Sequence, residues 1–200
     1  TFFGRAGSKA RADMWTAIHQ GPAPDGFGYI LDGKLNDVGY QSVTLPGTVA
    51  GLGEIHKRYG SMPWKEILAE PAALARRGFL VGPQMADFWR RPGLFGRVST
   101  GDRLALSEDG RAIWLPQGEP PAAGAVVTQD MLADTYDQLA AAGPRDFYEG
   151  ESASRITADW EDNGALVTAE DLRSYQVRWQ EPLRGRFLDR EICSTPLPGG

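Results

Sequence analysis

The sequence holds few residues of the types that build metal sites and disulfides: one cysteine and two histidines among 200 residues. Cys193 alone can form neither an internal disulfide nor a cysteine-based zinc site, and it leaves the cellular compartment open. His19 and His56 have no Cys, Asp or Glu at ligand spacing, so we predict no metal site and interpret both as surface or half-buried helix residues. No apolar run of about 18 residues occurs, and we therefore expect no membrane span.

Basic residues are too few to suggest a nucleic-acid partner. The chain has 21 Lys and Arg against 26 Asp and Glu, a formal charge of -5 and a pI near 5.1. Nucleic-acid binding draws most of its affinity from clustered cations, so we expect no such partner. A hydrophobic content of 42% is typical of globular proteins. The sequence lacks an initial Met and a signal peptide, and we expect it to be a piece of a longer protein.

Helical patterns cover much of the chain. We predict helices at about 9–19, 47–59, 63–78, 83–90 and 128–143, one more turn followed by a helix within 145–163, and a short helix from 168 to about 175. Pro46 is suited to begin the second of these helices, and Gly60 to end it. Thr128 is the predicted N-cap of a later helix, and Thr168 with Asp171 resembles a capping box.

Extended segments are shorter. The density of Gly, Pro and Asp across residues 21–39 predicts a loop with one hairpin. Residues 112–115 are a possible strand. Residues 177–196 alternate apolar and polar side chains, which predicts two or three strands and makes Cys193 a strand thiol. The fold class is therefore α+β, with helices in the majority.

The residues alone name no complete catalytic set. The pattern Gly47-x-x-x-Gly51-x-Gly53 has neither the glycine order of a dinucleotide-binding loop nor the Gly-Lys-Ser/Thr ending of a phosphate loop. We predict that these glycines let the helix pack closely against a neighbour. Glu161 and Asp162 are adjacent on a predicted helix and point apart, which argues against a paired acid and base.

Four stretches, in order along the chain, resemble the γ-glutamyltransferase family. They are LPGTVAGLGEIHKRYGSMPWKEILAEPAALARRGFLVG (45–82), AAAGPRDFYEGESASRI (140–156), NGALVTAEDLRSYQVRWQEPLRGRF (163–187) and STPLPGG (194–200). The resemblance covers almost the whole chain. It implies that residues 1–200 are a single segment of the family's large-subunit region, truncated at both ends.

Members of this family are N-terminal-nucleophile hydrolases, so the resemblance implies a partial αββα sandwich that is helix-rich in this segment. In the family a precursor cleaves itself before a Thr, whose hydroxyl then attacks an amide, and two glycine N–H groups stabilise the oxyanion. The resemblance places that Thr and those glycines beyond residue 200, so we expect no catalytic residue here and no activity from this chain alone. Gly199 and Gly200 are not the oxyanion pair. Neither a metal nor an organic cofactor is implied.

One substrate-binding residue is implied by the resemblance. Arg5 matches the large-subunit Arg that binds the substrate's α-carboxylate, a role that suits a planar guanidinium. Ala6 stands where the family has Glu, and Gly7 lies near its Pro, which is closer to the acylase-like members. Judged from the residues alone, Arg5 could instead cap or solvate the first helix. The expected partners are a small-molecule amide that carries a carboxylate and the downstream small-subunit portion of the same precursor.

Two other interpretations stay open at this point. A catalytically inactive family member would act as a binding or assembly subunit, and an unrelated helical interaction domain would fold by itself. The localisation is not predicted.

Overall fold

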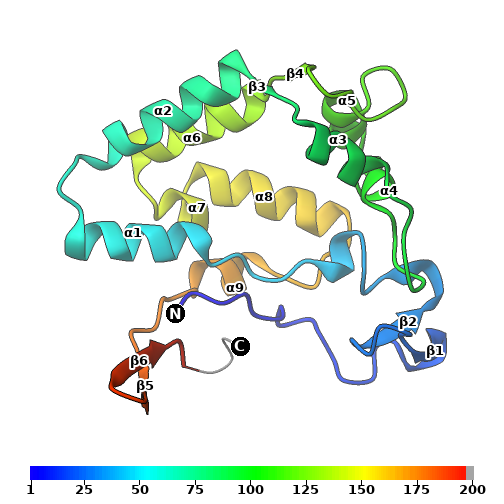
Figure 1. Cartoon of the computed structure of the whole chain (residues 1–200), viewed down its shortest axis with the longest axis horizontal. Coiled ribbons are helices and arrows are strands. Elements are labelled where there is room, and N and C mark those ends of the chain that lie inside the picture. Colours follow the sequence, from blue (N-terminus) through cyan, green and yellow to red (C-terminus); the bar gives the residue numbers. More distant parts are fainter. Residues whose placement is uncertain (197–200) are drawn as a thin grey trace.

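The computed structural model describes residues 1–196 as a mixture of helices and short strands (Figure 1). The helices are α1 (Thr48–Tyr59), α2 (Trp64–Arg77), α3 (Pro83–Arg90), α4 (Thr100–Leu104), α5 (Glu108–Trp114), α6 (Asp130–Ala142), α7 (Asp146–Glu149), α8 (Glu151–Asp162) and α9 (Ala169–Arg173). The strands are β1 (His19–Pro22), β2 (Tyr29–Leu31), β3 (Phe79–Leu80), β4 (Val126–Val127), β5 (Leu183–Phe187) and β6 (Arg190–Ser194). They pair antiparallel as β1–β2, β3–β4 and β5–β6. The predicted α+β class is confirmed.

The main core lies where α1, α7, α8 and α9 meet, with α2 and α6 packed side by side beyond it (Figure 1). Its buried members are Leu45, Tyr148, Ala153, Trp160, Ala165, Val167, Leu172 and Tyr175. A second, smaller core forms around α3 and the β3–β4 pair, from Val81, Ala86, Trp89 and Val127. Residues 1–196 therefore contain two hydrophobic cores, and the N-terminal segment lies against the first.

The glycine face of α1 packs as predicted. A Cβ on Gly51 would collide with the ring of Phe2, and one on Gly53 would lie 2.7 Å from the ring of Pro144. A Cβ on Gly47 would collide with both the carbonyl oxygen of Phe2 and the hydroxyl of Tyr175. These glycines bring the N-terminal segment and the α6–α7 corner against the helix.

Residues 9–19 do not form the predicted α-helix. The segment makes turns and a short 3-10 helix at Thr16–Ile18, and its apolar side chains are only partly buried. Lys9 is held by a hydrogen bond from its N–H to the carbonyl of Leu166 (3.2 Å), and the indole of Trp15 donates to Gln41 (3.1 Å). Helical spacing alone is a weak signal when an apolar face has no neighbour to pack against. His19 accordingly begins β1, opposite Leu31, and is exposed.

Two predictions in the middle of the chain are also corrected. Residues 112–114 belong to α5, because Ser107 caps that helix by accepting a hydrogen bond from the N–H of Gly110 (2.9 Å). The helix predicted to begin at Thr128 begins at Asp130, with Gln129 as its N-cap and no side-chain cap bond. The other predicted helices are found near their expected bounds, and the capping box of Thr168 and Asp171 is confirmed.

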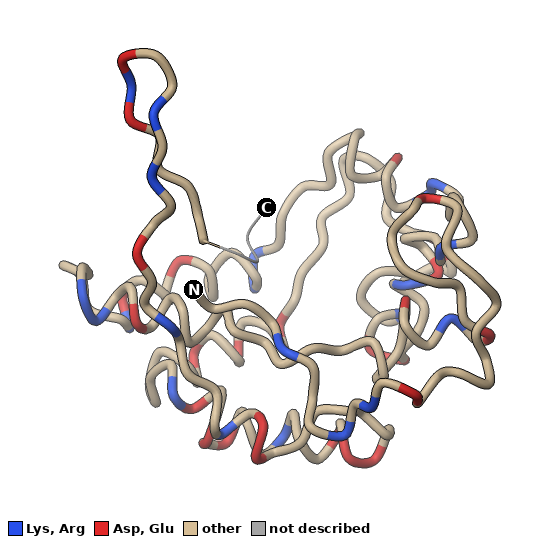
Figure 2. Tube along the Cα trace, turned by 90° about the horizontal axis from the view of Figure 1, so that it is seen from below, with Lys and Arg blue, Asp and Glu red and all other residues tan. Residues whose placement is uncertain are grey.

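The β5–β6 hairpin stands away from the rest of the molecule, as Figure 2 shows from below. Every residue of both strands is exposed, including Cys193, which is the predicted strand thiol. The segment 194–200 that resembled the family ends outside the described residues. None of the helices in residues 1–196 is long and apolar enough to cross a membrane.

Candidate functional site

Arg5 lies in a shallow groove between the N-terminal segment and the chain that follows α9. The groove has a volume of about 250 Å³. It is lined by Thr1, Phe3, Gly4, Arg5, Tyr175, Gln176, Arg178 and Gln180, and we call it the Arg5 groove. Its two walls are about 170 residues apart in the sequence, so the site exists only because of tertiary packing.

The first wall of the groove, formed by the N-terminal segment, is fixed by hydrogen bonds to its backbone carbonyls. The carbonyl of Arg5 accepts a hydrogen bond from the N–H of Leu45 (2.8 Å), which is a buried core residue. The carbonyl of Phe3 accepts one from the hydroxyl of Tyr175 (2.9 Å). The backbone around Arg5 is therefore fixed while its side chain is exposed.

Asp171 anchors the same segment to the start of α9. One oxygen of its carboxylate, Oδ2, accepts hydrogen bonds from the N–H and hydroxyl of Ser8 (both 2.9 Å) and from the N–H (2.9 Å) and hydroxyl (3.0 Å) of Thr168. Burial tends to raise the pKa of Asp171, but the hydrogen bonds from Ser8 and Thr168 outweigh it, so the pKa is lowered. The capping box thus closes the helix and ties down the segment that carries Arg5.

The second wall is an extended stretch that pairs with Thr1. The N–H of Arg178 donates to the carbonyl of Thr1 (2.9 Å), and the N–H of Thr1 donates to the carbonyl of Arg178. The hydroxyl of Thr1 donates to the side-chain carbonyl of Gln180 (2.8 Å). These bonds close one end of the groove.

The groove is electropositive. The guanidinium of Arg5 lies over the ring of Tyr175, 5.3 Å from its centroid, and no acidic residue lines the groove. Among residues 1–196, neither Arg5 nor Arg178 forms an ion pair. Nearby Arg145 differs, because Glu149 occupies its guanidinium at 2.7 Å. Arg5 is thus stacked, fixed at its backbone and open to an anionic ligand.

Of the residues that line the groove, sequence reasoning singled out Arg5 as a candidate and did not single out Arg178 or Gln180. The motif around Arg5 could be matched to a family pattern, whereas the other wall follows α9 with no motif of its own. The alternating positions of Gln176, Arg178 and Gln180 were the only pattern in the sequence that could have indicated polar side chains on one side of an extended segment.

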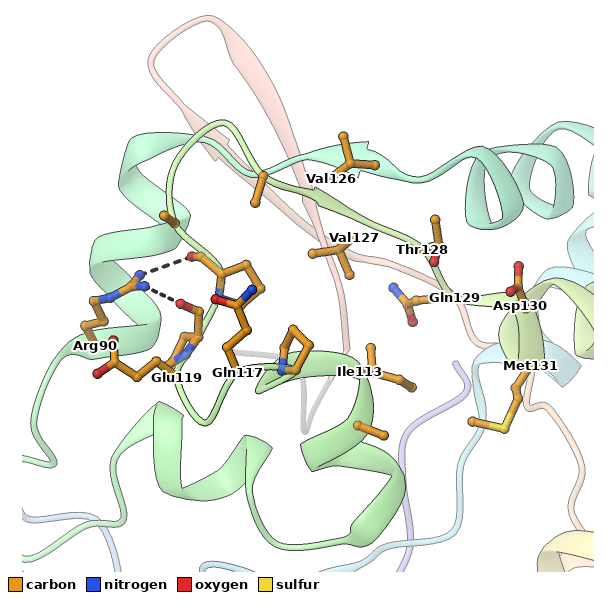
Figure 3. Close-up of a pocket in the computed structure, with 16 residues that line it drawn as sticks. Arg90, Ile113, Gln117, Glu119, Val126, Val127, Thr128, Gln129, Asp130 and Met131 are labelled. Atoms are coloured by element: carbon orange, nitrogen blue, oxygen red, sulfur yellow. Dashed lines mark hydrogen bonds between the residues drawn. The ribbon is translucent and has the colours of Figure 1, made fainter.

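Two much larger cavities offer less chemistry, and one of them adjoins the Arg5 groove through Tyr175 and Gln176. The one in Figure 3, of about 800 Å³, lies between α3, α5 and the start of α6, and its Arg90 is occupied by the carbonyls of Pro120 and Pro121. The other, of about 830 Å³, lies beside His56, whose Nε2 is bonded to the carbonyl of Met62 at 2.7 Å. Within the described part of the chain, no cluster of three or more His, Cys, Asp or Glu residues could hold a metal ion.

Comparisons with known proteins point to one family across the whole chain. The family described as "Gamma-glutamyltranspeptidase" matches residues 1–200. The chain is 33% identical over 167 residues to the glutathione hydrolase proenzyme of Pseudomonas aeruginosa, covering 82% of this chain and 28% of that protein. It is 32% identical over 203 residues to the acylase ACY 1 proenzyme of Pseudomonas sp. (strain V22), covering 96% of this chain and 33% of that protein.

A solved structure of the same family has a similar fold. The crystal structure of Helicobacter pylori gamma-glutamyltranspeptidase superposes with a TM-score of 0.82 at 27% identity, covering 98% of this chain and 52% of that chain. The chain thus spans about a third of the curated relatives and about half of this structure.

Proposed function

Because the chain belongs to the gamma-glutamyltranspeptidase family, we propose that it is a segment of the large-subunit region of a precursor that hydrolyses amides or transfers their acyl groups. The relatives are glutathione hydrolases and acylases, and their proenzyme names fit synthesis as an inactive precursor. In this proposal the whole protein carries the activity, residues 1–200 are a single segment of it, and this chain alone is inactive.

Arg5 is the observation that carries the proposal. Its guanidinium is exposed in a groove without acidic residues, and its stacking on Tyr175 holds the charge in place. A planar guanidinium in such a position suits bidentate binding of a carboxylate. We assign it the carboxylate of a small-molecule amide substrate. The relatives include hydrolases and acylases at nearly equal identity, and the Ala6–Gly7 sequence after Arg5 leads us to favour an acylase-like donor.

The nucleophile in this proposal is a Thr downstream of residue 200, which attacks the amide carbonyl after autocleavage frees its α-amine. The oxyanion donors also lie downstream. Residues 1–200 contribute the carboxylate-binding groove, and the reaction as proposed uses neither a metal nor an organic cofactor.

The remaining portion of the precursor is proposed to complete an αββα sandwich over the β5–β6 hairpin. On one face of this hairpin, Leu183, Phe187 and Ile192 are all at least half exposed. The opposite face carries Arg184, paired with Glu191 at 3.1 Å. An amphipathic hairpin with an uncovered apolar face supports packing against another layer.

The test uses the full-length protein. Denaturing electrophoresis and intact mass would be measured after incubation, and turnover of γ-glutamyl and simple acyl anilides would be followed in parallel. We expect two fragments, the smaller beginning with Thr, and hydrolysis of at least one anilide. A single uncleaved chain without turnover would refute the enzyme proposal and favour a catalytically inactive binding or assembly subunit.

A further inference from the structure

The cavity in Figure 3 lies along the free edge of β4, and we call it the β4 cleft. It is lined by the consecutive residues 125–130, together with residues of α3, α5 and the loop after α5. Successive side chains of a strand point to opposite faces, so a cavity that consecutive residues share lies beside their backbone. We propose that the β4 cleft binds an extended, basic peptide segment of another protein as an additional strand beside β4. This inference goes beyond the proposed function and does not depend on it.

The pairing of β4 with β3 determines which backbone groups face the cleft. Three alternate residues pair on the side of β3 and α2: the carbonyl of Ala125 with the N–H of Val81 (2.8 Å), Val127 with Phe79 in the β register, and the N–H of Gln129 with the carbonyl of Ala75 (2.8 Å). Backbone groups alternate between the two edges of a strand, so the N–H and C=O groups of Val126 and Thr128 face the other edge. Outside the β3–β4 ladder, neither residue forms a backbone hydrogen bond within residues 1–196. Their backbone groups can therefore pair with an added strand.

The walls of the cleft are braced, and its floor is apolar. Arg90 donates from Nη1 to the carbonyl of Pro121 (3.1 Å) and from Nη2 to the carbonyl of Pro120, which holds the loop after α5 against α3. Ile113 of α5 and the buried side chain of Val127 point into the cavity (Figure 3). Alternate side chains of an added strand can pack on this floor, while its backbone pairs with β4.

The open charges of the cleft are negative. Glu119 and Asp130 lie at opposite ends of the cavity in Figure 3, and neither forms an ion pair within residues 1–196. Arg90 is the one cation among the lining residues, and its guanidinium is engaged by backbone carbonyls. A peptide with a basic side chain near each end matches this distribution of charge.

The size and position of the cleft indicate a separate peptide. Its volume of about 800 Å³ lies within the range of roughly 300–1,000 Å³ that is typical of ligand sites. Five extended residues span about 17 Å, the length of the stretch 125–129. The β3–β4 pair lies at the top of Figure 1, far from the β5–β6 hairpin at the lower left, which the rest of the precursor is expected to cover. We therefore assign the cleft to another chain rather than to the remainder of the precursor.

Fluorescence anisotropy with the full-length protein tests the inference without relying on turnover. The probe is a labelled pentapeptide, Lys-Val-Thr-Val-Lys, with both termini blocked, and its matched neutral counterpart is Gln-Val-Thr-Val-Gln. We expect the basic probe to bind about fivefold more tightly at low ionic strength, because exposed charge pairs contribute modestly. Failure of the basic probe to bind the full-length protein would overturn the inference, including the case in which the precursor itself fills the cleft.

N-methylated probes test the strand pairing directly and leave the protein unmodified. One version of the basic probe is methylated at the backbone nitrogen of Thr, and the other at those of both Val residues. A strand pairs with its neighbour through alternate residues, so one version should lose about tenfold in affinity and the other should lose little. Equal affinities for the two versions would overturn pairing with the edge of β4.

Protein variants test the charge assignment. Glu119→Gln together with Asp130→Asn should reduce the preference for the basic probe over the neutral one to near unity. The matched control is Glu161→Gln together with Asp162→Asn, which removes two exposed carboxylates of α8 outside the cleft and should leave the preference unchanged. A preference that survives the first pair of substitutions would overturn the basic partner. Each of these results is independent of whether the precursor matures or hydrolyses anilides, so the inference and the proposed function can fail separately.

Discussion

At the scale of single residues, Asp171 connects the local structure of α9 to the position of the groove. Replacing it with Asn removes the charge that accepts bonds from Ser8 and Thr168, and we expect a loss of about 1–2 kcal/mol in the free energy of unfolding at pH 7. Urea unfolding of the full-length protein measures this loss. The affinity for carboxylate probes should also fall, because the segment that carries Arg5 becomes less fixed.

The pH dependence of this effect has a definite sign. The pKa of Asp171 is lowered in the folded protein, so its stabilisation is complete above the unfolded pKa of about 4 and is lost as the pH falls through the folded pKa. The stability difference between the wild type and Asp171→Asn should therefore shrink in acid. The control is Asp162→Asn, at the exposed end of α8, which should not destabilise the protein because a negative charge at a helix C-terminus is unfavourable. A deficit that stays constant from pH 7 to pH 3 would contradict this account.

Interactions between residues close in the sequence could be predicted from the spacing of those residues. Interactions between residues far apart in the sequence could not. The capping box needs only Thr168 and Asp171, three positions apart, and it was predicted. The same carboxylate also binds Ser8, which is 163 residues away, and no local pattern contains that contact. Arg178 was missed for the same reason, because its place in the groove depends on pairing with Thr1.

At the scale of elements, the start of α1 is capped by a side chain from another helix, because close packing excludes a side chain at its own N-cap. Gly47 is the N-cap of α1 and has no side chain to donate or accept, because a Cβ there would collide with Phe2 and Tyr175. The hydroxyl of buried Tyr148 satisfies the backbone there instead, since it accepts from the N–H of Ala50 (2.9 Å) and donates to the carbonyl of Pro46 (2.9 Å).

We predict that Tyr148→Phe costs about 1–3 kcal/mol of folding free energy, since it leaves two partly buried backbone groups at the helix start without a partner. A lowered urea midpoint would be measured, with the spectrum of the native protein unchanged. Tyr136→Phe on α6 is the matched control, because its hydroxyl makes no hydrogen bond within residues 1–196, and it should shift the midpoint little. Equal midpoints for both variants would show that water replaces the Tyr148 bonds.

The elements that were predicted well are those with both ends marked. Pro and Gly bracket α1 and α2, so their bounds followed from the sequence. In α6 only the end is marked, by Gly143, and only the end was predicted correctly. Residues 9–19 had helical spacing without such marks, and tertiary contacts gave them turns instead. Residues 112–115 were predicted as a possible strand, but residues 112–114 are helical because the Ser107 cap and the acidic first turn of α5 favour a helix there.

At the scale of the whole molecule, the β5–β6 hairpin is the part whose apolar face no other described residue covers. Register places Gly185 opposite Ile192, and Leu183 and Phe187 lie on the same face of the hairpin. Phe187 is 66% exposed and Ile192 50% exposed, while the other face carries charges that are stable in water. A two-stranded hairpin of this kind is marginally stable alone. If the chain is part of a longer precursor, as we propose, we expect the rest of that precursor to supply the layer that covers the hairpin.

Residues 1–200 produced alone should therefore bind a hydrophobic dye and unfold over a broad range of urea, while the full-length protein should do neither. Replacing Phe187 and Ile192 together with Thr should reduce the dye signal, because both side chains belong to the apolar face. Replacing Arg184 and Glu191 together with Thr is the control, since it changes the opposite face without altering the net charge. A sharp, cooperative transition without dye binding would mean that this segment folds as a complete unit, which would favour an independent helical interaction domain over a piece of a sandwich.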